Sequence, residues 1–432
     1  MEIFGSLPAL ARILAVFVLI LGAIRKKVSL GNAFCLGAAV LGLLFGLNPL
    51  EILRSAFFSF LDSKTLSLTV VVCLILVLSH SLEKSGQMDR LLDRFRGLVG
   101  HPGVNLVIFP ALIGLLPMPG GAVFSAPMVK TLGQGRLSGA RLSYVNYWFR
   151  HVWEYWWPLY PGVLLTTTLA DIDLWVFVPF LFPLTLVALT AGYWPLRGLK
   201  DSTRDEPSLS TKRSPAGPFL RELFPILLVI ALGLGLGSLF SLVLKPYQVV
   251  VGKELGLIAA LVVAIFWVWS FNGLSRTRRW EIVAQRQLAR MFYMVSAILI
   301  FKGILQDSHA VEVLGRELMS RDIPLVPVTI FLPMLVGGVA GITIAFVGTT
   351  FPILISLVHG FGETPWMLSY MMLALASGFV GVLLSPLHLC LLLSNEYFGT
   401  SLEPVYRYLW LPCFVLLASS IFYFGLLHHF LH

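Results

Sequence analysis

The sequence predicts an all-α polytopic membrane protein built from two inverted repeats, and three observations support this fold class. Hydrophobic residues make up 57% of the 432-residue chain and charged residues only 12%, which excludes a water-soluble globular protein. Apolar stretches of roughly 20 residues, the length that crosses the hydrocarbon core of a bilayer, recur about ten times. A segment of about fifty residues in the first half also recurs, without a gap, in the second half.

The repeat is defined by residues that recur at one constant offset. Ile75, Leu76, Leu82, Ser85, Leu91, Pro110, Leu112, Gly114 and Ala122 recur 223 positions later as Ile298, Leu299, Leu305, Ser308, Leu314, Pro333, Leu335, Gly337 and Ala345. The offset persists through a membrane helix, a polar connector and a Gly/Pro-interrupted segment, which chance similarity between apolar runs does not explain. Membrane proteins with two such repeats are usually carriers.

Transmembrane helices are expected at about residues 7–24, 28–47, 64–84, 138–165, 172–195, 219–243, 247–271, 288–308, 363–394 and 403–427. Two further apolar segments, about 103–131 and 326–358, are longer than one crossing and carry Gly and Pro at their centres. Each predicts a re-entrant helical hairpin, which enters and leaves the membrane on the same side. The first apolar segment is followed by Arg25, Lys26 and Lys27, so we expect a retained helix and not a cleaved signal.

The distribution of positive charge agrees with this topology. With both hairpins, the basic stretches Arg25–Lys27, Lys84–Arg96, Arg197–Arg213 and Arg276–Arg290 all lie on the cytoplasmic side, as the positive-inside rule requires. Both termini are then extracytoplasmic.

The same topology makes the repeats antiparallel. Four crossings separate the helix at 64–84 from its copy at 288–308, so the two copies run in opposite directions. Residues 1–195 and 219–432 are therefore predicted to be inverted repeats, with 196–218 as a cytoplasmic linker. Two halves of this kind can exchange conformations, which is the physical basis of alternating access.

Other classes of protein are disfavoured. The net charge of +9 does not predict a nucleic-acid partner, because the Lys and Arg residues sit in short loops where they set topology. Cys35, Cys73, Cys390 and Cys413 lie singly in apolar segments without CxxC spacing, so neither disulfides nor a metal site are predicted. No enzyme is expected, because the chain lacks the GxxxxGK(S/T), GxSxG and HExxH motifs.

The hairpin tips are candidate binding elements. The first reads LIGLLPMPGGAVFSAPMV, in which prolines and glycines free backbone groups before Ser125. The second reads GGVAGITIAFVGTTFPI, whose glycines and threonines supply the flexible turn and hydroxyls. Helix N-termini at such tips attract anions, and exposed carbonyls and hydroxyls coordinate cations. The alternative is close packing of helices through small residues.

After each hairpin comes a helix interrupted near its middle. The first, NYWFRHVWEYWWPLYPG, places Arg150, His151 and Glu154 close to the bilayer midplane, where charged side chains are functional candidates. Arg150 is predicted to hold an anionic group of the substrate, and Glu154 or His151 to take up a proton or cation. The alternative is an internal ion pair between Arg150 and Glu154, four residues apart. Pro158 breaks this helix, and the aromatic residues around it are expected to line the break.

The matching helix of the second half carries Ser385, Pro386 and His388, aligned with Trp157, Pro158 and Tyr160. Pro386 is the second predicted break, and His388 is either a ligand or a buried structural histidine. The predicted substrate-binding residues are Pro119, Gly120, Gly121, Ser125, Asn146, Arg150, His151, Glu154, Thr343, Gly348, Thr349, Thr350, Ser385 and His388. Glu154, His151, Thr349 and Thr350 are the predicted coupling-ion residues, and no cofactor is predicted beyond a coupling H⁺ or Na⁺.

The motifs LPMPGGAVFSAPMV and NYWFRHVWEYWWPLYPG resemble those of a bacterial and archaeal domain-of-unknown-function branch of the ion transporter superfamily. That superfamily of secondary carriers includes citrate, dicarboxylate, gluconate and arsenite permeases. The resemblance covers essentially the whole chain and implies a homodimer in the prokaryotic inner membrane. It also implies an elevator mechanism, in which a transport domain slides against a fixed scaffold. The first tip carries Pro-Gly-Gly where dicarboxylate carriers have a Ser-Asn-Thr signature.

These observations together predict a secondary active transporter of a small anionic solute, such as an organic acid, coupled to H⁺ or Na⁺. The alternative is a lipid-head-group translocase or a channel-like protein that uses the same midplane cavity.

Overall fold

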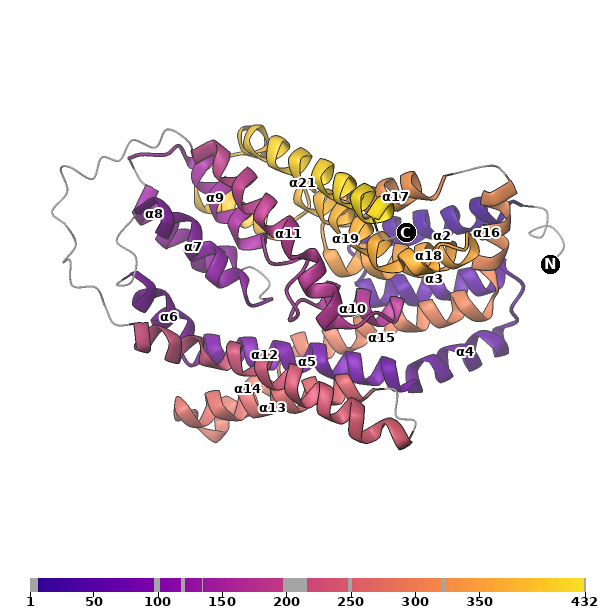
Figure 1. The fold of residues 1–432 in the computed structure, drawn as a ribbon, viewed down its shortest axis with the longest axis horizontal. Coiled ribbons are helices and arrows are strands. Elements are labelled where there is room, and N and C mark those ends of the chain that lie inside the picture. Colours follow the sequence, from indigo (N-terminus) through magenta and orange to yellow (C-terminus); the bar gives the residue numbers. More distant parts are fainter. Residues whose placement is uncertain are drawn as a thin grey trace.

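The computed structural model describes residues 7–96, 102–117, 121–133, 135–196, 216–247, 251–320 and 324–430. These residues form helices and connecting turns, with no strand among them (Figure 1). In the first half the helices are α2 (Ala9–Arg25), α3 (Leu30–Leu44), α4 (Pro49–Leu61), α5 (Ser63–Lys84), α6 (Gln87–Arg96), α7 (Pro102–Gly114), α8 (Ala122–Gly133), α9 (Gly139–His151), α10 (Pro161–Ala170) and α11 (Leu174–Tyr193). In the second half they are α12 (Ala216–Leu244), α13 (Gly252–Phe271), α14 (Arg276–Val283), α15 (Arg286–Asp307), α16 (Ala310–Ser320), α17 (Leu325–Ala340), α18 (Thr343–Gly360), α19 (Met367–Leu383), α20 (Leu389–Tyr397) and α21 (Leu402–Phe430).

Eight helical segments in the described part of the chain are long and apolar enough to cross a membrane. They are Ser63–Lys84, Leu174–Leu196, Ala216–Tyr247, Gly252–Phe271, Arg276–Asp307, Thr343–Gly360, Thr364–Leu383 and Leu402–His429. The predicted class of helical, multi-pass membrane protein is thereby confirmed. Seven of the segments coincide with predicted crossings, whereas Thr343–Gly360 was predicted to be one limb of a hairpin. The predicted crossings at 7–24, 28–47 and 138–165 correspond to shorter helices, α2, α3 and the pair α9 and α10.

The helices contact one another in two groups. The first helix group consists of α2–α5 and α12–α15, with α5 packed against α13 and α15 against α3. The second helix group consists of α7–α11 and α17–α21, with α7 packed against α9 and α17 against α19. The groups meet where α10 contacts α5, α18 contacts α15 and α17 contacts α2, and through the short helices α6 and α16. Figure 1 shows α12 to α14 along one edge of the molecule and α21 along the opposite edge.

Proline and glycine end the helices of the second group at the places the sequence predicts. The segment 103–131 forms α7 and α8, and 326–358 forms α17 and α18, so both predicted hairpins are pairs of contacting helices with a break between them. Gly341 ends α17 in the left-handed conformation, at φ 67°, which costs a glycine little because it has no Cβ. Their re-entrant course through a membrane stays a prediction.

Four short connecting helices were not predicted from the sequence: α4, α6, α14 and α16. Of these, α6 and α16 are clearly amphipathic. Asn48 begins α4 with a capping box to Glu51, and Ser275 caps α14, so side-chain hydrogen bonds fix the starts of both helices. Arg90 of α6 pairs with Glu222 of α12.

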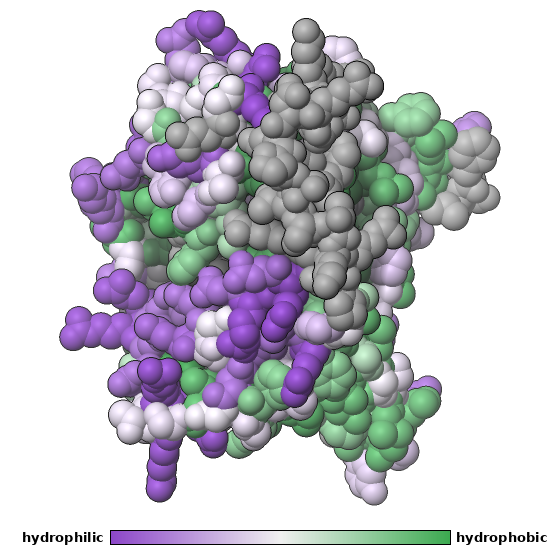
Figure 2. All heavy atoms as spheres, turned by 90° about the vertical axis from the view of Figure 1, so that its left-hand side faces the viewer, coloured by the Kyte–Doolittle hydropathy of each residue, from purple (hydrophilic) through white to green (hydrophobic). Residues whose placement is uncertain are grey.

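Hydrophilic side chains gather at one end of the molecule. Figure 2 looks at the end where α6, α7 and α8 lie, and hydrophilic residues cover a large part of this face, with hydrophobic residues at its flank. The apolar flank continues along helices such as α12, on which Leu220, Leu227 and Leu242 are exposed. A polar end and apolar sides fit a helical membrane protein.

The contact between α12 and α13 provides a test of packing. A Cβ atom on Gly256 of α13 would lie 2.3 Å from the Gly237 amide nitrogen and 2.4 Å from its Cα on α12. Because backbone cannot yield as a side chain does, we expect Gly256→Ala to destabilise the protein by about 1–3 kcal/mol. Thermal unfolding of the detergent-purified protein measures this. Gly235→Ala, whose Cβ meets nothing within 4 Å, is the control, and equal midpoints for the two variants would contradict the prediction.

Candidate functional site

Both predicted broken helices are broken in the structure. Ser138 caps the start of α9, and α9 ends at His151. Turns that include Pro158 follow, and α10 begins at Pro161, which occupies its first turn. In the second half, α19 ends at Leu383, and α20 begins at Leu389 after Pro386. Each interruption contains a proline, which lacks the amide proton that a continuous helix needs. Proline alone does not fix the break, because α9 already ends at His151 and Pro110 and Pro333 lie inside continuous helices.

The end of the first hairpin lies against the first break. A Cβ atom on Gly121, just before α8, would stand 2.1 Å from Arg150 Nη2 and 2.8 Å from its Cζ. Only glycine therefore lets the guanidinium approach the backbone here. Arg150 is 3% exposed, so the cation is enclosed by protein at the N-terminus of α8. A helix N-terminus and a guanidinium side by side both favour an anion.

The second hairpin reaches the same break from the other half of the chain. The Thr343 hydroxyl, at the start of α18, donates a hydrogen bond of 2.5 Å to Glu154 Oε1. The other carboxylate oxygen, Glu154 Oε2, lies 3.8 Å from His151 Nε2. The Glu154 side chain is 14% exposed and the His151 side chain 2%. Glu154 is thus the carboxylate that joins the first break to the second hairpin.

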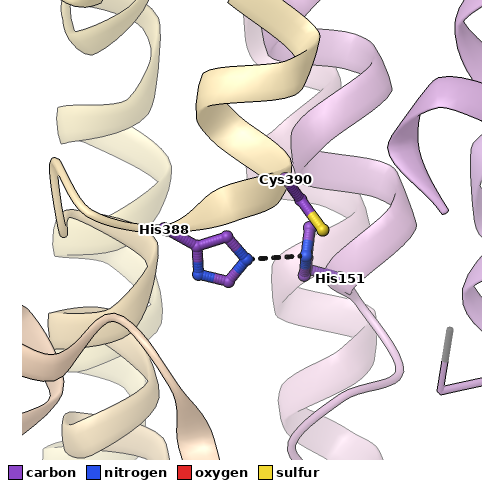
Figure 3. A group of neighbouring side chains, drawn as sticks. All are labelled: His151, His388 and Cys390. Carbon is purple, nitrogen blue, oxygen red and sulfur yellow. Dashed lines mark hydrogen bonds between the residues drawn. The ribbon is translucent and has the colours of Figure 1, made fainter. Parts of the chain in front are cut away.

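The second break completes the arrangement. His388 Nε2 lies 3.1 Å from His151 Nε2, and Figure 3 shows the two rings brought together from different helices. A Cβ atom on Gly341, at the end of α17, would lie 2.9 Å from Ser385 Oγ and 3.1 Å from the His388 amide nitrogen. Both hairpin ends and both breaks therefore converge around Arg150, His151 and Glu154.

Some predicted site residues connect helices directly. Asn146 is fully buried; its amide donates to the Ala122 carbonyl and the Ser394 hydroxyl, each at 2.9 Å. Ser125 Oγ donates to Asn146 Oδ1 at 2.5 Å. These bonds join α8, α9 and α20 beside the converging breaks. Asn146 and Ser125 hold the helices in register, and a direct contact with substrate stays a prediction.

Other predicted residues lie away from this centre. Gly348, Thr349 and Thr350 were expected in the flexible turn, but they lie inside α18, beyond its first turn. The hydroxyls of Thr349 and Thr350 donate to carbonyls of their own helix, Ala345 and Phe346, at 2.8 Å. The turn itself is Gly341 and Ile342, because Thr343 already begins α18. Pro119 and Gly120 lie outside the described residues.

Aromatic residues around the first break do more than line it. Trp153 Nε1 donates to the Ala111 carbonyl at 2.7 Å, and the Tyr160 hydroxyl donates to the Gly114 carbonyl at 2.6 Å. Both acceptors belong to the last turn of α7, which has no further helical amides to bond. The Tyr147 hydroxyl, at 3.1 Å, serves the Leu383 carbonyl at the end of α19 in the same way. The aromatic side chains therefore supply the donors that the interrupted helices lack.

Sequence reasoning missed two features. Cys390, interpreted as a small buried hydrophobe, lies with His151 and His388 in one cluster of donor atoms within 4.8 Å of one another. The alternation His388, Leu389, Cys390 directly after Pro386 was the available signal. The second feature is a cavity of about 210 Å³ lined by Lys64, Asp171, Lys253 and residues of α5, α10, α11, α12 and α13. It lies apart from the converging breaks.

The hydrogen bonds of Asn146 generate a prediction about stability. Asn146→Ala would leave the buried Ala122 carbonyl and the Ser125 and Ser394 hydroxyls with fewer partners, at a cost of about 3 kcal/mol. We expect a clear drop in the thermal unfolding midpoint in detergent. Asn32→Ala, at an exposed asparagine, should change the midpoint much less. Equal stability of Asn146→Ala and wild type would show that these bonds do not hold the helices together.

Comparison of the sequence with known proteins identifies a family. No curated protein matches the chain. The family model described as "Protein of unknown function (DUF401)" matches residues 6–427, which is nearly the whole chain. The chain therefore belongs to the DUF401 family.

Proposed function

We propose that the protein is a secondary active transporter of a small anionic solute, such as an organic acid, coupled to H⁺ or Na⁺ and working by an elevator-type alternating-access mechanism. The observation that carries this proposal is the convergence of two hairpin ends and two broken helices on Arg150, His151 and Glu154. Discontinuous helices of two repeats that meet at one centre are the usual construction of a carrier site.

Helix boundaries support the inverted repeats. Ser63 begins α5 and Arg286 begins α15, 223 residues later. Pro102 of α7 and Leu325 of α17 have the same separation. Beyond the hairpins the separation is 228 residues, both from Gly139 of α9 to Met367 of α19 and from Pro161 of α10 to Leu389 of α20. The order of long and broken helices is therefore the same in both halves.

Contacts between helices support the same pairing. The contact of α5 with α13 has its counterpart in that of α15 with α3, and the contact of α7 with α9 has its counterpart in that of α17 with α19. The contact of α10 with α18 likewise corresponds to that of α20 with α8. In each case, replacing every helix by its counterpart in the other half gives the second contact of the pair. Figure 1 places α6 to α8 toward one end of the long axis and α16 to α18 toward the other, as opposite orientation of the halves requires.

The two helix groups support an elevator mechanism. Both hairpins and both broken helices belong to the second helix group, so the candidate site lies within one body. We assign the second group to the transport domain and the first group to the scaffold. The resemblance to the ion transporter superfamily also leads us to propose a homodimer with a fixed scaffold.

The charges of the site favour an anionic solute. Arg150 provides a guanidinium beside the N-terminus of α8, and α18 begins at Thr343 on the other side of Glu154. A carboxylate could accept bidentate hydrogen bonds from Arg150. His151 and Glu154 are titratable groups in contact with the same centre, and intramembrane groups of this kind suit a proton pathway. Sodium is the alternative coupling ion.

Replacing Arg150 tests the anion assignment. Metabolite anions that raise the unfolding temperature of the detergent-purified protein are selected first, and their uptake into proteoliposomes is then measured. Arg150→Ala should weaken anion binding about 100-fold, because truncating one partner of a buried charged pair costs several kcal/mol, and should abolish uptake.

Arg141→Ala is the matched control, because Arg141 lies on the same helix and contacts Tyr408 outside the site. Arg150→Lys keeps the charge without the bidentate geometry. If the alanine variant is unstable, anion binding and uptake are measured in the lysine variant instead. Normal uptake by folded Arg150→Ala protein would overturn the anion assignment.

A cross-link between the helix groups tests the elevator mechanism. Gly348 of α18 packs on Ile298 of α15, with its Cβ position 2.7 Å from Ile298 Cγ2. In a protein freed of its four native cysteines, Gly348→Cys with Ile298→Cys should form a disulfide on oxidation, since the positions are within bonding reach. Uptake should stop on oxidation and return on reduction, because the second group can no longer move past the first.

The control pair is Gly37→Cys with Ile20→Cys, which joins α3 to α2 within the first group; there the Gly37 Cβ position is 2.5 Å from Ile20 Cδ1. This cross-link should leave uptake unchanged. Full transport by the oxidised Gly348/Ile298 pair would exclude a sliding movement at this interface.

A further inference from the structure

His151, His388 and Cys390 form a cluster that the transport proposal does not explain. Their donor atoms, two ring nitrogens and one sulfur, all lie within 4.8 Å of one another, and all three residues are buried. Figure 3 shows the Cys390 sulfur directed toward the His151 ring, with His388 on its other side. His151 belongs to the first broken helix, whereas His388 and Cys390 belong to the second. The cluster therefore bridges the two halves of the chain.

The distance between the two histidines fits a transition-metal ion. A tetrahedral zinc ion with Zn–N bonds of about 2.0–2.1 Å holds two ligand nitrogens about 3.3 Å apart. His151 Nε2 and His388 Nε2 are 3.1 Å apart, so little rearrangement is needed for both to bind one ion. Imidazole and thiolate prefer zinc or copper(I), whereas Na⁺, Mg²⁺ and Ca²⁺ prefer oxygen. The cluster is therefore unsuited to a coupling sodium ion.

The surroundings of His151 orient it for this role. His151 Nδ1 lies 2.5 Å from the Tyr147 carbonyl, to which it donates its proton. This bond assigns the lone pair to Nε2, the atom that faces His388. Histidine ligands in metal sites are commonly held by such a bond from the second ring nitrogen.

A hydrogen bond between the two histidines is the alternative role for the pair. In that arrangement His388 Nε2–H donates to His151 Nε2, and the remaining lone pair of His388 lies on the buried Nδ1. Metal binding moves the His388 proton to Nδ1 and frees both Nε2 lone pairs. Metal binding also explains why the sulfur of Cys390 lies beside the two histidines, whereas a hydrogen bond between the histidines does not.

An ion could reach the cluster through the second break. His388 is 6% exposed, but Leu387 on one side of it is 49% exposed and Leu389 on the other is 52% exposed. Pro386 is exposed as well. The ligands therefore lie one residue from the surface of an irregular segment.

We propose that His151, His388 and Cys390 bind a zinc-like transition-metal ion, which ties the two broken helices together. On binding, the Cys390 thiol releases its proton to solvent and the thiolate sulfur bonds to the metal, while each histidine contributes Nε2. These three ligands leave one position of a tetrahedral ion open. Glu154, whose Oε2 is 3.8 Å from His151 Nε2, is the neighbouring carboxylate that could approach it. Metal binding at this cluster does not require that the protein be a transporter.

The test uses detergent-purified full-length protein, stripped of metal by a chelator and titrated with Co²⁺ as an optical substitute for Zn²⁺. We expect binding of about one ion per chain with a thiolate-to-cobalt charge-transfer band, displaced by added Zn²⁺. Cys390→Ala should remove the band. Cys413→Ala, at another buried cysteine, should leave it. His388→Gln should weaken Zn²⁺ binding at least about 100-fold, whereas His80→Gln, at a buried histidine of α5, should not.

Two results would overturn the proposal. One is a wild-type protein that binds Co²⁺ without a thiolate band, and the other is a band that persists in folded Cys390→Ala. If Cys390→Ala does not fold, a protein in which Cys35, Cys73 and Cys413 are all alanine decides the question, because Cys390 is then its only thiol. The band must remain in that protein. Its loss would assign the thiolate to one of the other cysteines.

Discussion

Backbone groups freed by interrupted helices must find partners inside an apolar bundle, and the rest of this structure depends on how they do so. A buried carbonyl without a donor costs free energy comparable to a lost hydrogen bond. Here side chains of α9 and the first break supply the donors: Trp153 bonds the Ala111 carbonyl, Tyr160 the Gly114 carbonyl and Tyr147 the Leu383 carbonyl. These bonds join the first broken helix to α7 and α19, and charged residues can be held between the joined helices.

The sequence predicts the regions of the interruptions, because proline and glycine act locally, but it does not separate these prolines from Pro110 and Pro333, which lie inside helices. Pro158, Pro386 and Gly341 each lie where a helix ends or fails to continue. Charge inside an apolar segment is conspicuous, so the sequence singles out Arg150, His151 and Glu154. Arg150 and His151 are buried and the Glu154 side chain is 14% exposed, and their role in binding stays a prediction. These features need no knowledge of which helix lies beside which.

The partners of these residues could not be predicted in the same way. That Glu154 meets Thr343 from the other half depends on packing between segments 189 residues apart. Cys390 looked apolar in sequence because its neighbours are leucines, and only the fold brings it to His151. Thr349 and Thr350 were predicted to lie at the tip, but α18 begins at Thr343, and their hydroxyls donate to carbonyls of this helix. Contacts of long sequence separation decide all three cases.

The two halves share an order of helices but not every contact, and this difference bears on movement. α10 contacts α5 and α18 contacts α15. The counterparts of these contacts, α20 with α15 and α8 with α5, are at most marginal in the described part of the chain. The second helix group therefore rests on the first through unequal contacts at its two ends. If the inverted-repeat proposal holds, exchanging these contacts produces the opposite state. Arg150, His151 and Glu154 need not separate, because Gly121, Thr343 and His388, which lie against them, belong to the same group.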